Sequence, residues 1–198
     1  MTLVTDPYDP SVGFKLSRLA ADIVTVSHDH YDHNNIAAVH GTAGEPFVIS
    51  GPGEFEAKGV FVYGMPFWHD KSEGKERGPN TVYRIEIEGI SVVHLGDLGH
   101  TLNEEQAAEL DGADILLIPV GGKCTIGAYE AVEIINEVEP RIVIPMHYKI
   151  PGLKMDVESV DKFLKEMGAS KAERLPKLKI SKKDLPQEET KVILLEKS

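Results

Sequence analysis

The sequence predicts one mixed α/β domain in which two β-sheets pack together and helices cover the outside. Short β-branched and apolar runs recur along the 198 residues, as expected of many short strands. In the first half, apolar and polar residues alternate over 83–88 and turn at Glu88-Gly89, which predicts an antiparallel hairpin with one wet face. In the second half, solidly apolar runs such as 115–118 are typical of strands that are covered on both faces, and stretches with a helical pattern lie between them.

The predicted strands, in chain order, are residues 3–5, 23–26, 47–49, 59–63, 65–68, 83–87, 90–93, 115–118, 142–144 and 192–195. Residues 70–80 are charged, contain glycine and lack periodicity, so we expect a loop there.

Four stretches have helical features. A short helix should begin near His33 and use the apolar residues 36–39. Another should begin near Asn103, a good N-cap residue that acidic residues follow. Residues 128–138 and 156–167 are the other two, the last with one apolar stripe. We find no repeat or interior linker, so we expect one domain over the whole chain.

Composition limits the class of protein. A hydrophobic content of 41% with 27% charged residues is ordinary for a globular domain, and no apolar run approaches the ~20 residues of a membrane span. The N-terminus lacks the features of a signal peptide, and the single cysteine, Cys124, permits no internal disulfide; both favour a cytoplasmic protein. A net charge of −11 argues against a broad nucleic-acid-binding face, although it does not exclude a nucleotide substrate.

A cluster of metal-ligand side chains follows the predicted strand 23–26. One hexapeptide contains His28, His30 and His33 together with two aspartates, of which the second is Asp32. Extended backbone here would point His28, His30 and Asp32 to one side, because side chains alternate along a strand. Neutral imidazoles and a carboxylate that converge are ligands of a Zn²⁺-like cation. A polar loop with solvated histidines is the alternative, but it does not account for their density.

Three more ligand-type residues each follow an apolar run: His69 after 65–68, Asp97 after 92–95, and His147 after 142–146. Polar groups at strand ends on one rim of a sheet are the usual way in which α/β sites are assembled. A single histidine after a strand is more often a surface residue. Together with the hexapeptide, however, the three give seven ligand-type residues, which is enough for two neighbouring cations.

The hexapeptide, His28-x-His30-x-Asp32-His33, resembles the H-x-H-x-D-H signature of the metallo-β-lactamase superfamily. The other motifs of the superfamily follow in order at Asp6, His69, Gly96-Asp97 and His147, so the resemblance spans nearly the whole chain. The stretches 51–54, 94–100 and 119–122 are similar to a branch of small bacterial metal-dependent hydrolases that includes ascorbate-6-phosphate lactonase-like proteins. The resemblance implies a four-layer αββα sandwich of the metallo-β-lactamase type.

The resemblance also implies a ligand set. His28, His30 and His69 would hold a first metal, Asp32, His33 and His147 a second, and Asp97 would bridge both, so that Asp32 and Asp97 take part in catalysis. Zinc is the expected metal, with manganese, iron or nickel as alternatives. Two cations ~3.5–4 Å apart can share a hydroxide that attacks a carbonyl carbon or a phosphorus atom. Asp6 would support a ligand, although a turn-forming Asp-Pro is an equal alternative.

Other candidates stay open. His94 could line the pocket or be a hydrogen-bonded core histidine, and His100 could be a pocket base or only lead into a helix. We expect His40 on the surface. Arg77 and Asn80 follow His69 and could reach a substrate, but a solvated loop is the simpler interpretation.

The chain departs from the superfamily at two places. Relatives usually carry a short strand pair before the Asp-Pro segment, and this chain begins inside that region. We expect that these strands are missing, or that a neighbouring copy or the C-terminal tail covers the edge; a homo-oligomer is therefore an expectation. The β-lactam-cleaving members commonly use a zinc-binding cysteine, but Cys124 follows Gly121-Gly122, away from any matching ligand position, so we expect it to be structural or part of a pocket wall. The two glycines could offer N–H groups to an anion or simply form a turn.

The leading prediction is a metal-dependent hydrolase of a small, anionic ester, lactone or phosphodiester, with a small molecule as its partner. A nuclease of the same superfamily is an alternative, which the acidic charge disfavours. A redox di-iron enzyme fits less well, because His30 stands where flavodiiron relatives carry a carboxylate. A non-catalytic metal-binding or scaffold module would not require seven intact ligands.

Overall fold

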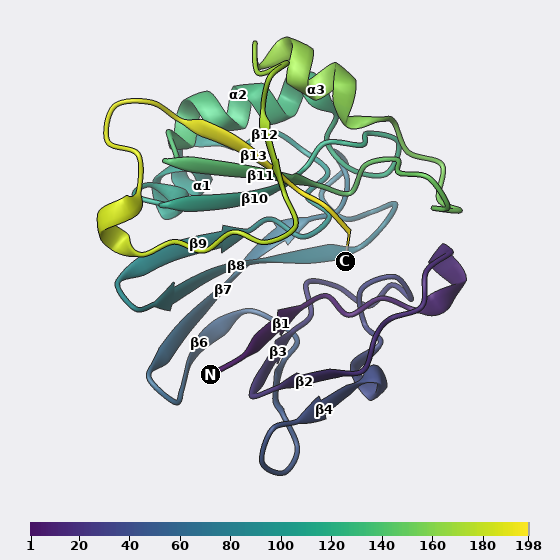
Figure 1. The fold of residues 1–198 in the computed structure, drawn as a ribbon. Helices are drawn as coiled ribbons and strands as arrows, with labels where there is room; N and C mark the ends of the chain where they lie inside the picture. Colours follow the sequence, from purple (N-terminus) through teal and green to yellow (C-terminus); the bar gives the residue numbers. More distant parts are fainter. Residues whose placement is uncertain (198) are drawn as a thin grey trace.

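The structure, a computed structural model, describes residues 1–197 and has the mixed α/β fold that the sequence predicts (Figure 1). An eight-stranded sheet crosses it in the order β12-β13-β11-β10-β9-β8-β7-β6. Its strands are β6 (Gly53–Ala57), β7 (Val60–Trp68), β8 (Pro79–Ile87), β9 (Ile90–His94), β10 (Ile115–Pro119), β11 (Ile142–Met146), β12 (Glu173–Leu175) and β13 (Lys191–Leu195). Only Ser198 lies outside the described residues.

The sheet has an antiparallel and a parallel half, as the two rhythms of the sequence predict. Strands β6, β7, β8 and β9 pair antiparallel with their neighbours. Strands β9, β10, β11, β13 and β12 pair parallel. The predicted hairpin is β8–β9, where Glu88 and Gly89 both have positive φ angles of 51° and 77°, as a tight turn between twisted strands requires.

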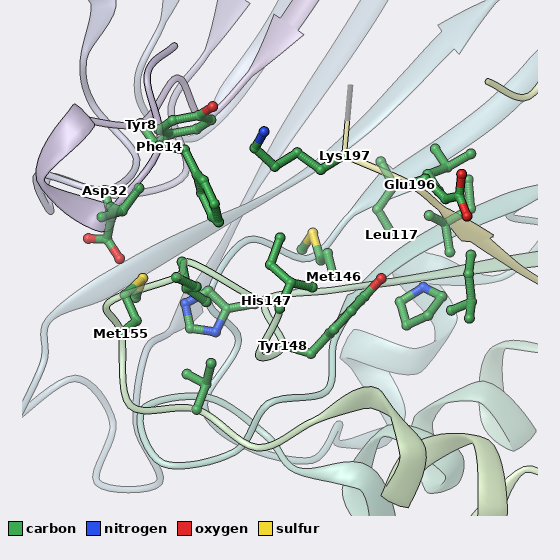
Figure 2. Close-up of a pocket in the computed structure, with 18 of the residues that line it drawn as sticks. Tyr8, Phe14, Asp32, Leu117, Met146, His147, Tyr148, Met155, Glu196 and Lys197 are labelled. Carbon is green, nitrogen blue, oxygen red and sulfur yellow. The ribbon is translucent and has the colours of Figure 1, made fainter. Parts of the chain in front are cut away.

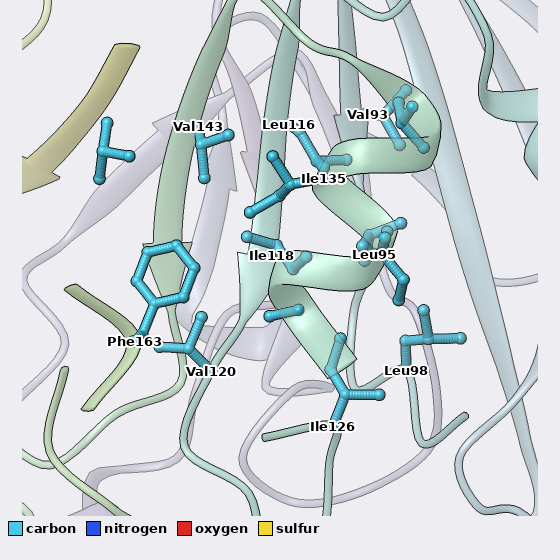
Figure 3. Close-up of a cluster of buried hydrophobic side chains, with 14 of the residues drawn as sticks. Val93, Leu95, Leu98, Leu116, Ile118, Val120, Ile126, Ile135, Val143 and Phe163 are labelled. Atoms are coloured by element: carbon cyan, nitrogen blue, oxygen red, sulfur yellow. The ribbon is translucent and has the colours of Figure 1, made fainter. Parts of the chain in front are cut away.

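Helices α1 (Glu104–Leu110), α2 (Ala128–Val138) and α3 (Val160–Glu166) lie over one face of this sheet (Figure 1). Asn103 caps α1 as predicted: its side chain accepts the N–H of Gln106, and the Gln106 side chain accepts the N–H of Asn103. Figure 3 shows the core beneath the helices, a buried cluster to which Ile118 of β10 and Ile135 of α2 both belong. Apolar burial against the parallel half therefore fixes the helical layer.

The N-terminal third forms a second layer against the antiparallel half. Strands β1 (Leu3–Thr5), β3 (Ile23–Thr25) and β5 (Phe47–Ile49) form one parallel sheet, and β2 (Leu19–Ala21) pairs with β4 (Val39–Gly41). Ile23 and Ile49 of the small sheet pack against Val62 and Ile85 of the large one. The Tyr83 hydroxyl also donates to the carbonyl oxygen of Val26 at 2.8 Å, which ties β8 to the segment leading into the hexapeptide.

The outer layer on the small sheet's side is thin. Within residues 1–197, the N-terminal third carries the short 3₁₀ helices η1 (Pro10–Val12) and η2 (Ile36–Ala38), and a further one, η3 (Lys182–Asp184), lies near the C-terminus. The short helix predicted from near His33 is present only as η2, a single 3₁₀ turn that begins at Ile36. Its apolar stretch spans about one turn, which costs more to nucleate than it returns, and the Asn35 side chain does not cap it.

Three predicted boundaries also differ. The runs 59–63 and 65–68 are one strand, β7, because Gly64 pairs with Tyr83 without a break. The last predicted helix begins at Val160 rather than at residue 156. The predicted loop ends at Gly78, since β8 starts at Pro79. No helix among the described residues is both long and apolar enough to cross a bilayer.

Candidate metal centre

The hexapeptide follows β3 through a tight turn. The N–H groups of His33 and Asn34 both donate to the carbonyl oxygen of His30, at 2.9 and 3.1 Å. The prediction of extended backbone with alternating side chains is wrong here. The imidazoles nevertheless converge, because the turn folds the loop back: the ring centroids of His28 and His30 lie 4.5 Å apart, and those of His28 and His33 lie 4.3 Å apart.

His28, His30 and His69 form a first group of ligand-type side chains. One nitrogen of each ring lies within 4.8 Å of the others. His69 directly follows β7, and its ring centroid is 4.7 Å from that of His28. His28 and His69 are buried whereas His30 is partly exposed, so the group can be reached from one side.

Asp32, His33 and His147 form a second group, whose ligand atoms also lie within 4.8 Å of one another. His147 directly follows β11 and has a φ angle of 54°, in the left-handed region that non-glycine residues seldom adopt. Such backbone costs of order 1–3 kcal/mol and persists where the surrounding structure imposes it, often at functional sites. Here it turns the imidazole toward the hexapeptide.

Asp97 lies between the two groups. Its Oδ2 is 3.3 Å from Nε2 of His69, 3.9 Å from Nε2 of His28 and 3.5 Å from Nε2 of His147. Its Oδ1 is 3.3 Å from Nε2 of His33. A single buried carboxylate therefore faces both groups of histidines.

Asn80 and Gly96 hold Asp97 in this place. Asn80 is fully buried; its Oδ1 accepts the N–H of Asp97 at 2.9 Å and its Nδ2 donates to the carbonyl oxygen of Leu95 at 2.9 Å. Gly96 has a φ angle of 55°, and a Cβ there would lie 2.6 Å from Cβ of Ser27. The expectation that Asn80 lies in a solvated loop or reaches a substrate is therefore wrong; it is a support for the turn that carries Asp97.

The donor set fits metal ions. Several of its buried atoms have no hydrogen-bond partner: Nε2 of His28, Nδ1 of His69, Oδ1 of Asp97 and both ring nitrogens of His147. Unpaired polar atoms in a buried site cost free energy unless something binds them. Imidazoles and carboxylates in groups of three, with an anion between the groups, match the donors that zinc-type cations prefer.

Asp6 supports the second group from behind. Its Oδ2 accepts Nδ1–H of His33 at 2.7 Å and the Ser27 hydroxyl at 2.6 Å, while its Oδ1 accepts the Ser27 N–H at 2.8 Å. Asp6 also has a positive φ angle of 45°. A carboxylate that holds one ring nitrogen of a histidine leaves the other nitrogen oriented toward a metal. The geometry favours this supporting role over a simple turn-forming Asp-Pro.

The protonation preferences of the site are strongly perturbed. Burial lowers the pKa of His28 to about 3, helped by the nearby His33. Burial also opposes protonation of His33, but Asp97, Asp32 and Asp6 outweigh it and raise the pKa of His33 well above its usual value. For Asp97, burial favours the neutral acid, yet His147, His33 and His69 hold its pKa below the usual range. The carboxylate is thus ready to bind cations.

Sequence reasoning missed Asp70. This buried residue follows His69, and its carboxylate accepts four backbone N–H groups: Ser72 at 2.8 Å and Gly74 at 3.0 Å on Oδ1, and Glu76 at 3.1 Å and Arg77 at 2.8 Å on Oδ2. It therefore organises the whole loop 71–78 beside the first group. The only signal in the sequence is an aspartate that precedes a short glycine-containing loop.

The remaining candidates lie around the centre. His94 is buried at the end of β9, its Nδ1 has no hydrogen-bond partner, and it is not among the residues that line the cavity described below. His100 accepts the Trp68 N–H at 3.3 Å and stacks on Phe67, which steadies the end of β7. His40 is exposed, as expected, and the side chain of Arg77 is exposed on the loop.

Cys124 lies nearer the centre than expected. Its Sγ forms a group with an oxygen of Asp97 and a ring nitrogen of His147, all within 4.8 Å of one another. Burial and the charge of Asp97 raise the pKa of this thiol to about 11. Sequence reasoning placed Cys124 away from the ligands because no matching motif contains it.

A cavity of about 770 Å³ opens onto the second group (Figure 2). Asp32, His33 and His147 line one part of it, and apolar side chains such as Phe14 and Leu194 line much of the rest. Figure 2 shows Asp32 and Met155 on one side of the view and Leu117 and Glu196 on the other, with His147 between them. The basic residues Arg174 and Lys197 also line the wall.

Comparisons with known proteins place this geometry in context. A family model described as "Beta-lactamase superfamily domain" matches residues 1–147. A UPF0173 metal-dependent hydrolase from Thermococcus onnurineus is 30% identical over 188 residues, which cover 82% of this chain and 84% of the relative. A second one, from Pyrococcus horikoshii, is 32% identical over 166 residues, or 69% of this chain and 71% of the relative. Neither name states a substrate, so the lactonase-like resemblance stays a prediction.

Solved structures agree on the fold. A protein from Thermotoga maritima, described as a Zn-dependent hydrolase of the metallo-β-lactamase superfamily, is 39% identical with a TM-score of 0.78, covering 98% of this chain and 88% of its own. An isothiocyanate hydrolase from Delia radicum gut bacteria is 13% identical with a TM-score of 0.61, covering 97% of this chain and 88% of its own. The second likeness concerns the fold alone.

Proposed function

The chain belongs to the metallo-β-lactamase superfamily and is a metal-dependent hydrolase, and we propose that it uses two metal ions to cleave a small anionic ester, lactone or phosphodiester. Zinc is the proposed metal, because imidazoles are its usual ligands in proteins. Three imidazoles form the first group, and the second group has two imidazoles and one carboxylate, Asp32. Manganese, iron and nickel are the alternatives.

The position of Asp97 carries the proposal of two metals. One oxygen lies near His69, His28 and His147 and the other near His33, so the carboxylate can serve both groups at once. Two dications held close together repel and need an anion between them. The proposal therefore assigns the His28, His30 and His69 group to one metal, the Asp32, His33 and His147 group to the other, and Asp97 to both.

The chain's own residues prepare this centre for hydrolysis. Two divalent cations held there would lower the pKa of water and stabilise the negative charge that develops on the oxygen of the attacked carbonyl or phosphoryl group. Asp6 fixes the His33 ring through Nδ1, so that Nε2 faces Asp97. Asn80 and the Gly96 turn hold the backbone that carries the Asp97 carboxylate. Because these side chains are already in position, the site needs little reorganisation during the reaction.

The cavity supports a substrate with an apolar part. The residues of the second group line this cavity. A substrate whose scissile bond lies at the metals would therefore have the rest of its atoms in contact with Phe14, Leu194 and their apolar neighbours. Arg174 and Lys197 offer positive charge to an anionic end. An acidic chain with a cavity of this kind suits a small molecule better than a nucleic acid.

A substrate panel tests the proposal. Zinc-loaded protein should hydrolyse esters, lactones or phosphodiesters that carry an anionic group, and within an active class kcat/KM should rise as the apolar part lengthens. Phe14→Ala should weaken this dependence on length, whereas Phe61→Ala, on the exposed side of β7, should leave it unchanged. The absence of hydrolysis across the panel by protein with its full metal content would favour a non-catalytic metal-binding role.

A further inference from the structure

We infer that Cys124 is a ligand of the second metal ion, so that this ion is held by a thiolate in addition to imidazole and carboxylate groups. The inference rests on the proposed two-metal centre and specifies the chemistry of one of its sites. It would make that site softer than the first, with a preference for Zn²⁺ or Cd²⁺ over Mn²⁺.

The first support is the convergence of three different segments. Sγ of Cys124, an oxygen of Asp97 and a nitrogen of His147 all lie within 4.8 Å of one another, so small adjustments would let one cation contact all three. Asp97 follows β9, His147 follows β11, and Cys124 lies in the loop between β10 and α2. His147 also belongs to the group of Asp32 and His33, so the thiol lies beside the second metal's proposed ligands rather than at a separate site.

The second support is that the neighbours of the thiol are buried and unpaired. The side chain of Asp97 is 3% exposed and that of His147 is 10% exposed. Oδ1 of Asp97 and both ring nitrogens of His147 have no hydrogen-bond partner. A cysteine that only packed as a small hydrophobic group would more naturally have apolar neighbours.

The third support is that the loop carrying Cys124 is anchored to the segments that carry Asp97 and His147. The N–H of Ile126 donates to the carbonyl oxygen of Leu98 at 2.9 Å, which ties the loop to the segment that carries Asp97. A Cβ at Gly121 would lie 2.0 Å from the carbonyl oxygen of His147, so the loop also runs against the end of β11. The N–H of Cys124 donates to the carbonyl oxygen of Gly122 at 2.8 Å.

The binding step is a deprotonation and coordination without redox change. The S–H bond of Cys124 breaks, its proton passes to solvent, and the sulfur electron pair forms the bond to the cation. The cation supplies the driving force for this ionisation, as it does at other thiolate sites.

Cobalt replacement tests the inference, because a thiolate bound to Co²⁺ gives a sulfur-to-metal charge-transfer band in the near ultraviolet that oxygen and nitrogen ligands do not give. Metal-free protein is titrated with Co²⁺ and the bound metal is counted in the same samples. The band should appear as the second site fills, should be absent in Cys124→Ser, and should persist in Thr125→Val, a change in the same loop that keeps the thiol. Cys124→Ser should also lose about 10-fold or more in Cd²⁺ affinity at one site, with a smaller loss for Mn²⁺.

A measurement on the unaltered protein guards against a variant that fails to fold. Cys124 is the chain's only cysteine, so labelling by a thiol reagent reports on this residue alone. Loading with Zn²⁺ should slow labelling by about 10-fold or more relative to metal-free protein, because a bound thiolate is a poorer nucleophile.

The outcomes separate the inference from the function on which it rests. Two bound metals with identical Co²⁺ spectra for the wild type and Cys124→Ser, together with unchanged thiol labelling, would overturn the thiolate ligand and leave the two-metal centre standing. Fewer than two bound metals in the wild type would instead count against the proposed centre itself.

Discussion

At the scale of single residues, Asp97 is the group on which the centre depends. Asp97→Ala should lower bound metal from about two per chain toward one and slow turnover by at least ~10²-fold, because the two oxygens of Asp97 lie near histidines of both groups. Metal content after dialysis and steady-state rates are the measurements. Asp29→Ala is the matched control, since Asp29 lies in the same hexapeptide but is exposed. A variant of Asp97 that keeps its full metal content and most of its activity would contradict the bridging role.

Asp70 acts through the loop that it organises. Asp70→Ala removes the acceptor of four N–H bonds, so the amides of Ser72, Gly74, Glu76 and Arg77 should exchange with solvent at least ~10-fold faster. Hydrogen exchange followed by mass spectrometry reads this out. Glu73→Ala, in the same loop but exposed, should leave the rates unchanged. Equal amide exchange rates in the two variants would show that the loop keeps its conformation without the Asp70 carboxylate.

Ligand types could be predicted from the sequence, and the support from Asp6 from the family resemblance, whereas the roles of Asn80, Asp70 and Cys124 could not. Donor chemistry is a property of the side chain itself, so the dense hexapeptide and the residues after strands pointed to metal binding. Asn80, Asp70 and Cys124 act through partners far along the chain or through backbone groups, and nothing local in the sequence reveals these.

At the scale of elements, the β10–α2 loop can approach the end of β11 only because Gly121 has no side chain. In Gly121→Ala, the new Cβ would lie 2.0 Å from the carbonyl oxygen of His147. The unfolding free energy should fall by about 1–3 kcal/mol, and metal affinity should weaken as His147 shifts. Urea denaturation and metal titration check this against Gly51→Ala, whose Cβ would meet nothing within 4 Å. Equal stability of the two variants would mean that the loop can move aside without cost.

A second element-scale prediction concerns pH. Asp22 lies between β2 and β3, and its carboxylate accepts bonds from Lys58, Thr42 and the N–H of Thr2, which together hold its pKa below the usual range. A group whose folded pKa is lowered adds stability above its unfolded pKa of about 3.8, and loses it as pH falls through the folded value. Asp22→Asn should therefore be less stable than the wild type at pH 7, with a gap that narrows below pH ~4. A gap independent of pH in urea denaturation would contradict the role of the charge.

Elements were predictable where the signal was local. Helix α2 was predicted to its residue bounds because its apolar stripe is regular, and α1 because Asn103 marks its start. The hexapeptide turn and η2 were not predictable, because their conformation depends on packing against distant segments. Strand β4, which directly follows η2, pairs with β2 through Leu19 opposite Val39, for example. Strand order in the large sheet likewise depends on long-range pairing, which a single sequence does not display.

At the scale of the whole molecule, two layers meet at one edge where the strands deliver their ligands. The small sheet contributes the hexapeptide through β3, and the large sheet contributes His69, Asp97 and His147 through β7, β9 and β11. Ligands from both layers mean that metal binding should tie the layers together and stabilise the whole fold.

Equilibrium metal counting, combined with activity, tests the central claim most directly. Protein stripped by a chelator and then dialysed against Zn²⁺ should bind two ions per chain by mass spectrometry. Hydrolysis of the best substrate in the panel should vanish on stripping and return as the second ion binds. One ion per chain at full activity, or hydrolysis that survives complete removal of metal, would contradict the two-metal account.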